Sequence, residues 1–460
     1  MSHLPVSIQE KMVMKAPPPN EVKYWNEGIE TMPRRELMEL QWELVREQIK
    51  YVYERSRFYK KRLDEAGVKP DEIRSIEDFN RKVPITCKDD IRLDIERTGD
   101  IFGGTLCVPL QEVFYAGPST GTTGQPTQTA LTPGDMTFAR ENVARQFWTM
   151  GLRPGDFCMF WVLGGHPGMP VCQRTLHLIG MPYSELALCP AFFEAELDRW
   201  TQTMQKLPVA TSWVPYTLLW TYKDYIEKCN VSPKDTLGRS KLIFTSGDIV
   251  TSALRQSLED YWGTELHEMA LTADVMFGFH TCEVRGGLHV PEDLFVIEVV
   301  DPWTGEPVPM GQPGYLVVTP TYPEATCHLR WNSEDIVHMS DEPCQCGRTS
   351  TRIWFHGRLI NLVNIQGQDI FPSAVTDELL QIPEIGMMGL DCQMVKTSPT
   401  TQDRLLVRTA YYKDKVKDIS SVREKVEDRL KARFSVPAAV EFMEPQEIAK
   451  HKFERVIKRY

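Results

Sequence analysis

The chain has 460 residues, of which 42% are hydrophobic, and it carries a formal net charge of -11. This length and apolar content predict two or three domains with large cores rather than one small domain. The acidic balance excludes the broad basic surface that nucleic-acid binding requires, so we expect no nucleic-acid partner.

Targeting signals and disulfides are not expected. Residues 1–21 lack a continuous apolar core after their charges, and the most apolar internal run, Phe157 to Val171, is interrupted by glycine and proline. The 11 cysteines are an odd number scattered through a long chain, unlike a secreted disulfide framework. We therefore expect a cytoplasmic protein without a membrane partner.

The amino-terminal part of the chain is predicted to be helical. Residues Val6 to Glu21 contain three consecutive prolines, Pro17 to Pro19, and are expected to form an irregular arm. From Arg34 onward, Leu37, Leu40 and Leu44 recur at three- and four-residue steps, which is the helical period. We expect this apolar face to pack against the main body.

The stretch from Tyr115 to Ala130, YAGPSTGTTGQPTQTA, is the strongest local motif. Hydroxyls and glycines are so dense there that several hydroxyls and bare backbone amides can face one anion. The motif is neither a Walker loop nor a G-x-G-x-x-G dinucleotide loop. A flexible surface loop is the alternative, but the density and the turn-setting Pro126 favour phosphate binding. The candidate ligands are Ser119, Thr120, Gly121, Thr122, Thr123 and Gly124.

Strand and helix patterns alternate after this loop. A helix is predicted from Pro133 to Met150, a buried strand from Phe157 to Leu163, and a strand-helix unit from Gly180 to Lys206. A short strand, Lys241 to Thr245, precedes a helix from Ser252 to Trp262. This alternation predicts an α/β fold with a largely parallel sheet, covered on both sides, whose ligands sit beyond the carboxyl ends of the strands.

The last third of the chain changes pattern. Residues 293–319 alternate apolar residues with Gly/Pro turns and predict a small antiparallel β subdomain. Beyond them, strands are predicted at Cys392 to Lys396, Arg404 to Tyr412 and Ala438 to Met443, with an amphipathic helix from Ile419 to Phe434. These elements predict a compact α+β cap.

Ser119 to Pro126 resembles the phosphate-binding loop of the adenylate-forming enzymes, whose usual form is Ser-Ser/Thr-Gly-Thr-Thr-Gly-x-Pro. These are the acyl-CoA synthetases, the peptide-synthetase adenylation domains and the luciferases. The segments YWNEGIETMPRRELMELQ, YERSRFYKKRLDEAGV and VPITCKDDIR are similar to the opening of phenylacetate-CoA ligases, the group that the whole chain most resembles.

The resemblance implies two domains and a two-step reaction. Residues 1–356 would form a large domain with parallel or mixed sheets and a small β subdomain, and residues 357–460 a small mobile α+β domain. A carboxylic acid, in this group aromatic, would be activated with ATP to an acyl adenylate, and its acyl group would pass to coenzyme A. Trp148, Phe160, Trp161, Trp213 and Tyr216 are candidate walls for a flat acid, with core packing as the alternative.

The resemblance also implies nucleotide contacts. Asp248, after the strand that ends at Thr245, stands for the Glu of an adenine-contact loop, although an ordinary acid at a helix N-terminus is an equal alternative. Asp335, in LRWNSEDIV, stands where a carboxylate accepts both ribose hydroxyls, with a surface acid in a turn as the alternative. Arg358 would reach the ribose or the α-phosphate as a forked cation.

Magnesium and the reacting centre complete the implied site. Thr123 and Asp274 are the candidates for the magnesium ion; Asp274 lies in ALTADVMFGFHTC, where the family motif is poorly matched and its tyrosine is missing. In the tail AKHKFERVIKRY, Lys452 takes the place of the catalytic lysine. Its ammonium would neutralise the charge that builds as a carboxylate oxygen attacks phosphorus, and a solvated basic helix end is the alternative.

Cys282 and His289 bracket the sequence EVRGGL, and Cys344 and Cys346 form a Cys-x-Cys pair. Three thiolates and one imidazole make a tetrahedral zinc set, whereas small core residues are the alternative for any cysteine. Phenylacetate-CoA ligase relatives with Cys-Glu-x-x-x-Gly-Leu-His and Cys-x-Cys-Gly-Arg-Thr hold a structural zinc there, and both halves are matched. Four protein ligands leave no position for an activated water, so the Zn²⁺ is expected to stabilise the fold.

Two other functions stay open. At the hinge motif GRLINLVNIQGQDIFPSAV, Ile360 with Asn361 and Gln366 replace the family's acid and arginine, which favours an enzyme that passes the acyl group to an amine or a carrier protein. The weak match around Asp274 favours a nucleotide-binding or scaffold protein that has lost turnover. A homodimer is a further open expectation.

Overall fold

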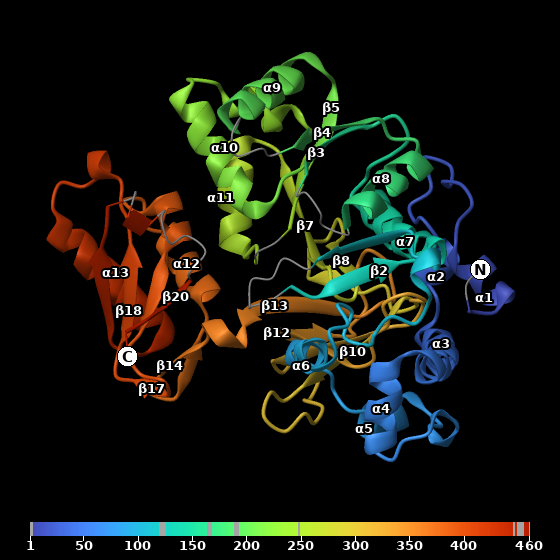
Figure 1. The fold of residues 1–460 in the computed structure, drawn as a ribbon. Helices are drawn as coiled ribbons and strands as arrows, with labels where there is room; N and C mark the ends of the chain where they lie inside the picture. The colour runs from blue at the N-terminus through green and yellow to red at the C-terminus, as the bar shows by residue number, and fades with distance from the viewer. Residues whose placement is uncertain are drawn as a thin grey trace. The chain divides into compact units, whose positions relative to one another are not determined.

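The computed structural model describes residues 3–118, 126–162, 168–187, 193–246, 249–444, 447–448 and 455–459. The chain divides into two compact units (Figure 1). The first comprises Met1–Gly247, Thr264–Ser333 and Val337–Trp354, and the second comprises Asp248–Gly263, Glu334–Ile336 and Phe355–Tyr460. The predicted cut at Gly357 would give two continuous stretches, whereas the second unit also takes in two short pieces of the preceding chain.

The chain is helical from Arg34, as its period predicted, whereas Val6–Met12 forms a helix where an irregular arm was expected. The helices are α1 (Val6–Met12), α2 (Glu27–Glu30), α3 (Arg34–Arg55), α4 (Arg57–Glu65), α5 (Ile76–Lys82) and α6 (Lys88–Thr98). α3 buries Leu37, Leu40 and Leu44 on one face. Burial of this stripe, rather than helix propensity, holds α3 to the body of the unit.

An eleven-stranded mixed sheet crosses the first unit, in the order β10-β11-β12-β13-β9-β8-β7-β6-β5-β3-β4. The parallel half consists of β4 (Tyr183–Ala187), β3 (Phe157–Val162), β5 (Val209–Trp213), β6 (Leu242–Thr245) and β7 (Glu265–Thr272). The other strands are β8 (Phe277–Thr281), β9 (Leu288–His289), β10 (Phe295–Val300), β11 (Gly314–Pro320), β12 (Trp331–Ser340) and β13 (Arg352–Arg358).

The mixed sheet confirms the α/β class and limits the prediction of a largely parallel sheet to one half. β7 pairs antiparallel with β8, β8 with β9, and β10 with β11. A short turn joins β7 to β8, and residues 301–313, which contain no helix, join β10 to β11; neither connection contains the crossover helix that usually links parallel strands. The predicted β subdomain is therefore a continuation of the main sheet.

A helix follows each of β3, β4, β5 and β6, as the alternation predicted, and a further helix precedes β3. They are α7 (Pro133–Thr149), α8 (Gly168–Ile179), α9 (Phe193–Lys206), α10 (Tyr216–Lys228) and α11 (Ser252–Trp262). α7 packs against α8 and is buried along most of its length. Its N-terminus is closed by a capping box between Thr132 and Asp135, which satisfies backbone N–H groups that the helix leaves unpaired.

A separate hairpin carries the predicted phosphate loop. β1 (Tyr115–Pro118) pairs antiparallel with β2 (Gln128–Leu131), and the last pair of the ladder joins Pro118 to Gln128. The hairpin therefore fixes the two ends of the intervening segment a strand spacing apart.

The second unit has its own core. A four-stranded sheet in the order β19-β18-β16-β20 and a three-stranded sheet in the order β15-β14-β17 accompany α12 (Pro372–Leu380) and α13 (Ile419–Phe434). The strands are β14 (Val363–Ile365), β15 (Gln368–Ile370), β16 (Gln393–Lys396), β17 (Thr401–Gln402), β18 (Leu405–Thr409), β19 (Ala438–Phe442) and β20 (Val456–Lys458). α13 contributes Val422, Val426 and Leu430 to the core, which confirms the compact α+β cap. Among all the residues that the structure describes, no helix is long and apolar enough to span a membrane.

Candidate functional site

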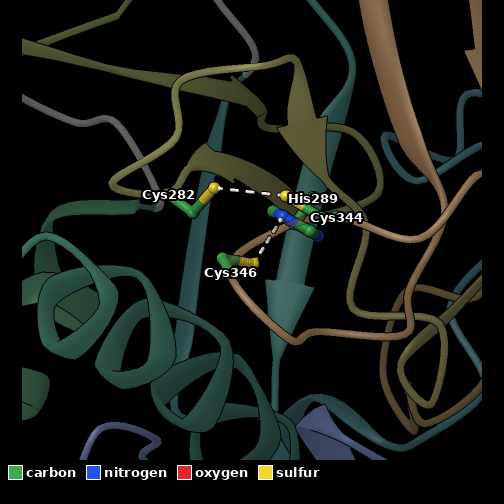
Figure 2. Close-up of side chains that lie close together, drawn as sticks. All are labelled: Cys282, His289, Cys344 and Cys346. Carbon is green, nitrogen blue, oxygen red and sulfur yellow. Dashed lines mark hydrogen bonds between the residues drawn. The ribbon is translucent and has the colours of Figure 1, made fainter.

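Three cysteines and one histidine meet in a buried cluster (Figure 2). Cys282 follows β8, His289 belongs to β9, and Cys344 and Cys346 lie in the turn between β12 and β13. One ligand atom from each residue lies within 4.8 Å of the others. The sulfurs of Cys282 and Cys344 are 3.8 Å apart, and the Cys346 sulfur is 3.4 Å from Nε2 of His289. The structure thus brings the two halves of the predicted metal set together.

The surroundings of this cluster suit a metal ion. Nδ1 of His289 lies 3.0 Å from Oγ of Ser350, which orients the ring so that Nε2 faces the sulfurs. The Cys282 thiol and the neighbouring His289 hold the pKa of Cys346 well below its usual range, so a thiolate is favoured there. Thiolate and neutral imidazole are the ligand forms that zinc requires.

The sequence reasoning missed Ser350 and Arg348 as support for the cluster. The backbone N–H of Arg348 points to the Cys346 sulfur at 3.5 Å, and its guanidinium Nε donates to Glu30 at 2.8 Å. Both residues belong to the run CQCGRTS. The only signal in the sequence was their position next to Cys344 and Cys346. The side chains that they contact, His289 and Glu30, lie far away in sequence.

Three groups of predicted nucleotide residues lie outside the described residues. They are the loop ligands Ser119, Thr120, Gly121, Thr122, Thr123 and Gly124, the adenine candidate Asp248, and the catalytic candidate Lys452. The described flanks of the loop are β1 and β2, so only its two ends are defined.

Asp274 lies in the tight turn between β7 and β8, and its carboxylate accepts two bonds. Thr127 Oγ1 donates to Oδ1 at 2.6 Å, and Lys88 Nζ lies 3.1 Å from Oδ2. The side chains of Lys88 and Asp274 are each 12% exposed. Thr129 also donates its hydroxyl to the carbonyl of Ala273, at 3.1 Å. Sequence reasoning missed Lys88 and Thr127, because nothing in the local pattern around either residue indicates this partner.

Asp335 and Arg358 come together in the second unit. Asp335 lies in β12 and Arg358 ends β13, and the distance from Arg358 Nε to Asp335 Oδ1 is 3.4 Å. Both side chains are partly exposed, so both can be reached by a ligand from solvent. The preceding Glu334 has a φ of 65°, a left-handed conformation that most residues avoid.

The hinge substitutions are also defined. Ile360 is exposed, and Gln366, in a left-handed conformation, donates its amide to the carbonyl of Asp403 at 2.8 Å. Gly357 has a φ of 145°, and a Cβ atom there would lie 2.8 Å from the Phe371 ring. Glycine is thus required at this position by both conformation and space.

The aromatic wall candidates are mostly core residues. Trp148, Phe160 and Trp161 are fully buried and pack among other apolar side chains. Trp213 ends β5, where its indole N–H donates to Ser246 Oγ at 3.1 Å and its ring stacks on Phe244. The side chain of Tyr216 lies outside the described set. Trp213 is also buried in the same core, but it is the candidate that stands at the carboxyl end of a parallel strand, where ligands of such sheets sit.

Comparisons with known proteins give consistent likenesses. The family model described as the AMP-binding enzyme C-terminal domain matches residues 367–459. A phenylacetate-coenzyme A ligase of Thermus thermophilus is 32% identical over 367 residues, which is 78% of each chain, and one of Escherichia coli is 26% identical over 373 residues.

Solved structures extend the likeness along almost the whole chain. 2-Hydroxyisobutyryl-CoA ligase in the postadenylation state, in complex with R3-HIB-AMP, superposes with a TM-score of 0.86 at 25% identity, covering 96% of this chain and 94% of that one. ATP-bound MatB from Rhodopseudomonas palustris shares the fold with a TM-score of 0.54 at 13% identity, over 74% of this chain and 66% of its own.

Proposed function

Because the chain belongs to the phenylacetate-CoA ligase family, we propose that the acid it activates is aromatic, of the phenylacetate or benzoate kind. The protein is an AMP-forming ligase that activates a carboxylic acid with ATP and forms its CoA thioester. The likeness to phenylacetate-CoA ligases over most of both chains carries the aromatic proposal. The same relatives favour CoA over an amine or a carrier protein as the acceptor.

A small aliphatic hydroxy acid is the second candidate substrate. The specific observation in its favour is the structural likeness to 2-hydroxyisobutyryl-CoA ligase, which covers 96% of this chain. The position of Trp213 at the carboxyl end of β5 favours the aromatic acid, because a flat ring stands there, although that ring is buried in the core. Its stacking on Phe244 and its bond to Ser246 would keep that ring in one orientation.

The chemistry proceeds in two displacements. A carboxylate oxygen attacks the α-phosphorus of ATP, the bond from phosphorus to the bridging oxygen breaks, and pyrophosphate leaves. The CoA sulfur then attacks the acyl carbon, and AMP leaves with the electrons of the broken carbon–oxygen bond. We assign the β- and γ-phosphates to the loop from Ser119 to Gly124, and the charge of the first transition state to Lys452.

Adenosine is assigned to Asp248, Asp335 and Arg358. The ion pair between Asp335 and Arg358 supports this proposal, because it holds an acceptor for ribose hydroxyls next to a forked donor for a phosphate. Magnesium is assigned to Thr123 and Asp274. A carboxylate offers about four lone-pair sites, so the bonds from Thr127 and Lys88 leave Asp274 room for a metal ion.

Zinc is assigned to Cys282, His289, Cys344 and Cys346. The burial of all four residues and the proximity of their ligand atoms support a closed, structural site. No reaction step is assigned to this metal, because four protein ligands complete its tetrahedral shell.

ATP–pyrophosphate exchange over a panel of aryl and short hydroxy acids tests the function. We expect one aryl acid to give the highest kcat/KM. Lys452→Ala should lower exchange by about a hundredfold or more, because it removes a charge that acts in the transition state. Lys450→Ala, two residues away, is the matched control and should stay close to the native rate.

Three outcomes would contradict these assignments. A preference for hydroxy acids would favour the second substrate, and equal exchange in the two lysine variants would remove Lys452 from its role. Absence of exchange with every acid would favour a fold that has lost turnover.

A further inference from the structure

Asp274 joins three segments that are distant in sequence. Its two carboxylate oxygens face Lys88, the first residue of α6, and Thr127, which leads into β2. Both charged side chains are 12% exposed, and Thr127 is buried. Removing one partner of such a pair leaves the other charge poorly solvated, so the geometry is favoured strongly over separated side chains.

Hydrogen bonds hold the backbone at the start of α6, where Lys88 lies. The N–H of Thr86 donates to the carbonyl of Arg330, and the N–H of Asn332 donates to the carbonyl of Thr86, each at 2.9 Å. The N–H of Cys87 donates to Asp90 at 2.8 Å, which caps α6. The start of α6 is thus held on β12, and the lysine side chain extends from a rigid base.

β2 and the residue before it are bound to the same turn. Thr127 donates to the carboxylate of Asp274, and Thr129 donates to the carbonyl of Ala273. Residues two apart on an extended chain face the same side, so both hydroxyls reach the turn between β7 and β8. Thr127 lies three residues after Gly124, at the exit of the proposed phosphate loop.

His328 lies close to the pair of Lys88 and Asp274, but it does not supply a second positive charge. Burial lowers the pKa of His328 to about 4, with the proximity of Asp274 acting in the opposite direction, so its ring is neutral at physiological pH. His328 packs against Trp331 and lies near the hydroxyl of Tyr59. The positive partner of Asp274 in this contact is therefore Lys88.

We propose that Lys88 and Thr127 are positioning residues for ATP binding: with Asp274 they form a clamp that fixes the exit of the phosphate loop. This inference rests on the proposed role of Ser119 to Gly124 as the phosphate ligands. Amides and hydroxyls bind an anion well only when they are held in place beforehand, because ordering them on binding costs free energy. Neither residue needs to touch the nucleotide.

The test uses two pairs of variants in the full chain. Thr127→Val keeps the shape but removes the donor, and Thr127→Ser restores it. Lys88→Met removes the charge, and Lys88→Arg restores it. Lys223→Met is the matched control, because Lys223 is 10% exposed and pairs with Glu227 at 2.7 Å on α10. The readouts are the ATP Kd by calorimetry with magnesium chelated, KM and kcat for ATP and for the acid, and Tm.

We expect Thr127→Val and Lys88→Met each to weaken ATP binding about tenfold, the loss of one bond to a charged group, with or without magnesium. KM for the acid should stay within about twofold, and Thr127→Ser and Lys88→Arg should recover most of the affinity. The double variant Thr127→Val, Lys88→Met should lose less ATP affinity than the product of the two single losses, because both residues share Asp274 as a partner.

Two results would overturn the clamp. One is an ATP affinity in Thr127→Val equal to that in Lys223→Met. The other is a parallel change of every constant with Tm, which would indicate general destabilisation. If Lys88→Met does not fold, the Thr127 pair still decides. Thr122→Val separates the two proposals: if it leaves ATP binding unchanged, the loop assignment fails; if it weakens binding while Thr127→Val does not, only the clamp fails.

Discussion

Asp135 shows how one buried carboxyl can set a pH dependence. It is almost fully buried, and it accepts backbone N–H bonds from Thr132 at 2.8 Å, Glu324 at 2.6 Å and Ala325 at 3.1 Å. Burial outweighs these donors and raises the pKa of Asp135 to about 7. The folded chain therefore holds a proton, between about pH 4 and pH 7, that the unfolded chain has released.

The sign of the effect follows from this proton. Because the unfolded state binds fewer protons in that window, Asp135 makes the free energy of unfolding fall as pH rises, by at most about 1.4 kcal/mol per unit. In Asp135→Asn, urea unfolding midpoints at pH 5 and pH 7 should differ less than in the native protein. Asp135→Ser is the alternative variant if the asparagine amide disturbs the three backbone N–H donors. Parallel pH curves for native and variant proteins would contradict the assignment.

Single residues were predictable where their chemistry is local. The sequence predicted four metal ligands, because thiols and imidazole at short spacing are unusual, and the structure gathers all four. It missed Lys88, because an unremarkable lysine at a helix start gains meaning only from Asp274, which lies 186 residues away. It also offered Trp148 and Trp161 as pocket walls, although they are core residues, since an aromatic residue has the same pattern in both roles.

At the scale of elements, the cluster of Cys282, His289, Cys344 and Cys346 joins a hairpin to a turn. β8 and β9 supply one side, and the turn between β12 and β13 supplies the other. The two-residue β9 makes few ladder bonds of its own, so the proposed zinc, as a crosslink, would contribute much of the local stability.

We expect about one zinc per chain by elemental analysis of the purified protein. The double variant Cys344→Ser, Cys346→Ser should lose the zinc and lower Tm by several degrees, because the hairpin and the turn are no longer crosslinked. Cys229→Ser, at an exposed cysteine, is the control and should keep both. A double variant that remains as stable as the native protein without zinc would refute the structural role.

Elements with a strong period were the easiest to predict. The helix predicted from Ile419 to Phe434 is α13 with the same bounds, because its apolar residues recur at four-residue steps and Asp418 caps it. The sheet was harder, since periodicity gives strands but not their partners. The predicted β subdomain became β10 and β11 at one end of the main sheet because strand pairing is decided by contacts far apart in sequence.

At the scale of the whole molecule, the chain forms two units that each have a core. The second unit includes Glu334–Ile336 from within β12, so Asp335 and Arg358 belong to the same unit. The sequence predicted two domains from a family resemblance, but a single boundary in the sequence cannot represent a unit made of three pieces of chain. Which pieces associate depends on packing, and packing is not visible in a one-dimensional pattern.

The proposed role of Lys452 leads to a prediction about the two half-reactions of the whole enzyme. Lys452 is proposed to act at the α-phosphate, where charge builds only in adenylation. Lys452→Ala should therefore lose most ATP–pyrophosphate exchange and still form the thioester from a supplied acyl adenylate and CoA within about tenfold of the native rate. Rapid-quench assays of the two half-reactions measure both. Equal losses in the two would mean that the lysine supports the fold or both steps.

The turn that holds Cys346 also receives the beginning of the chain. Tyr24 donates its hydroxyl to the carbonyl of Cys346 across 322 positions, and Arg348 pairs with Glu30 across 318. During synthesis Tyr24 and Glu30 emerge from the ribosome more than 300 residues before these anchors. Until then, the segment around Tyr24 and Glu30 lacks these two partners, so its final packing cannot be completed before residues 346–348 have been made.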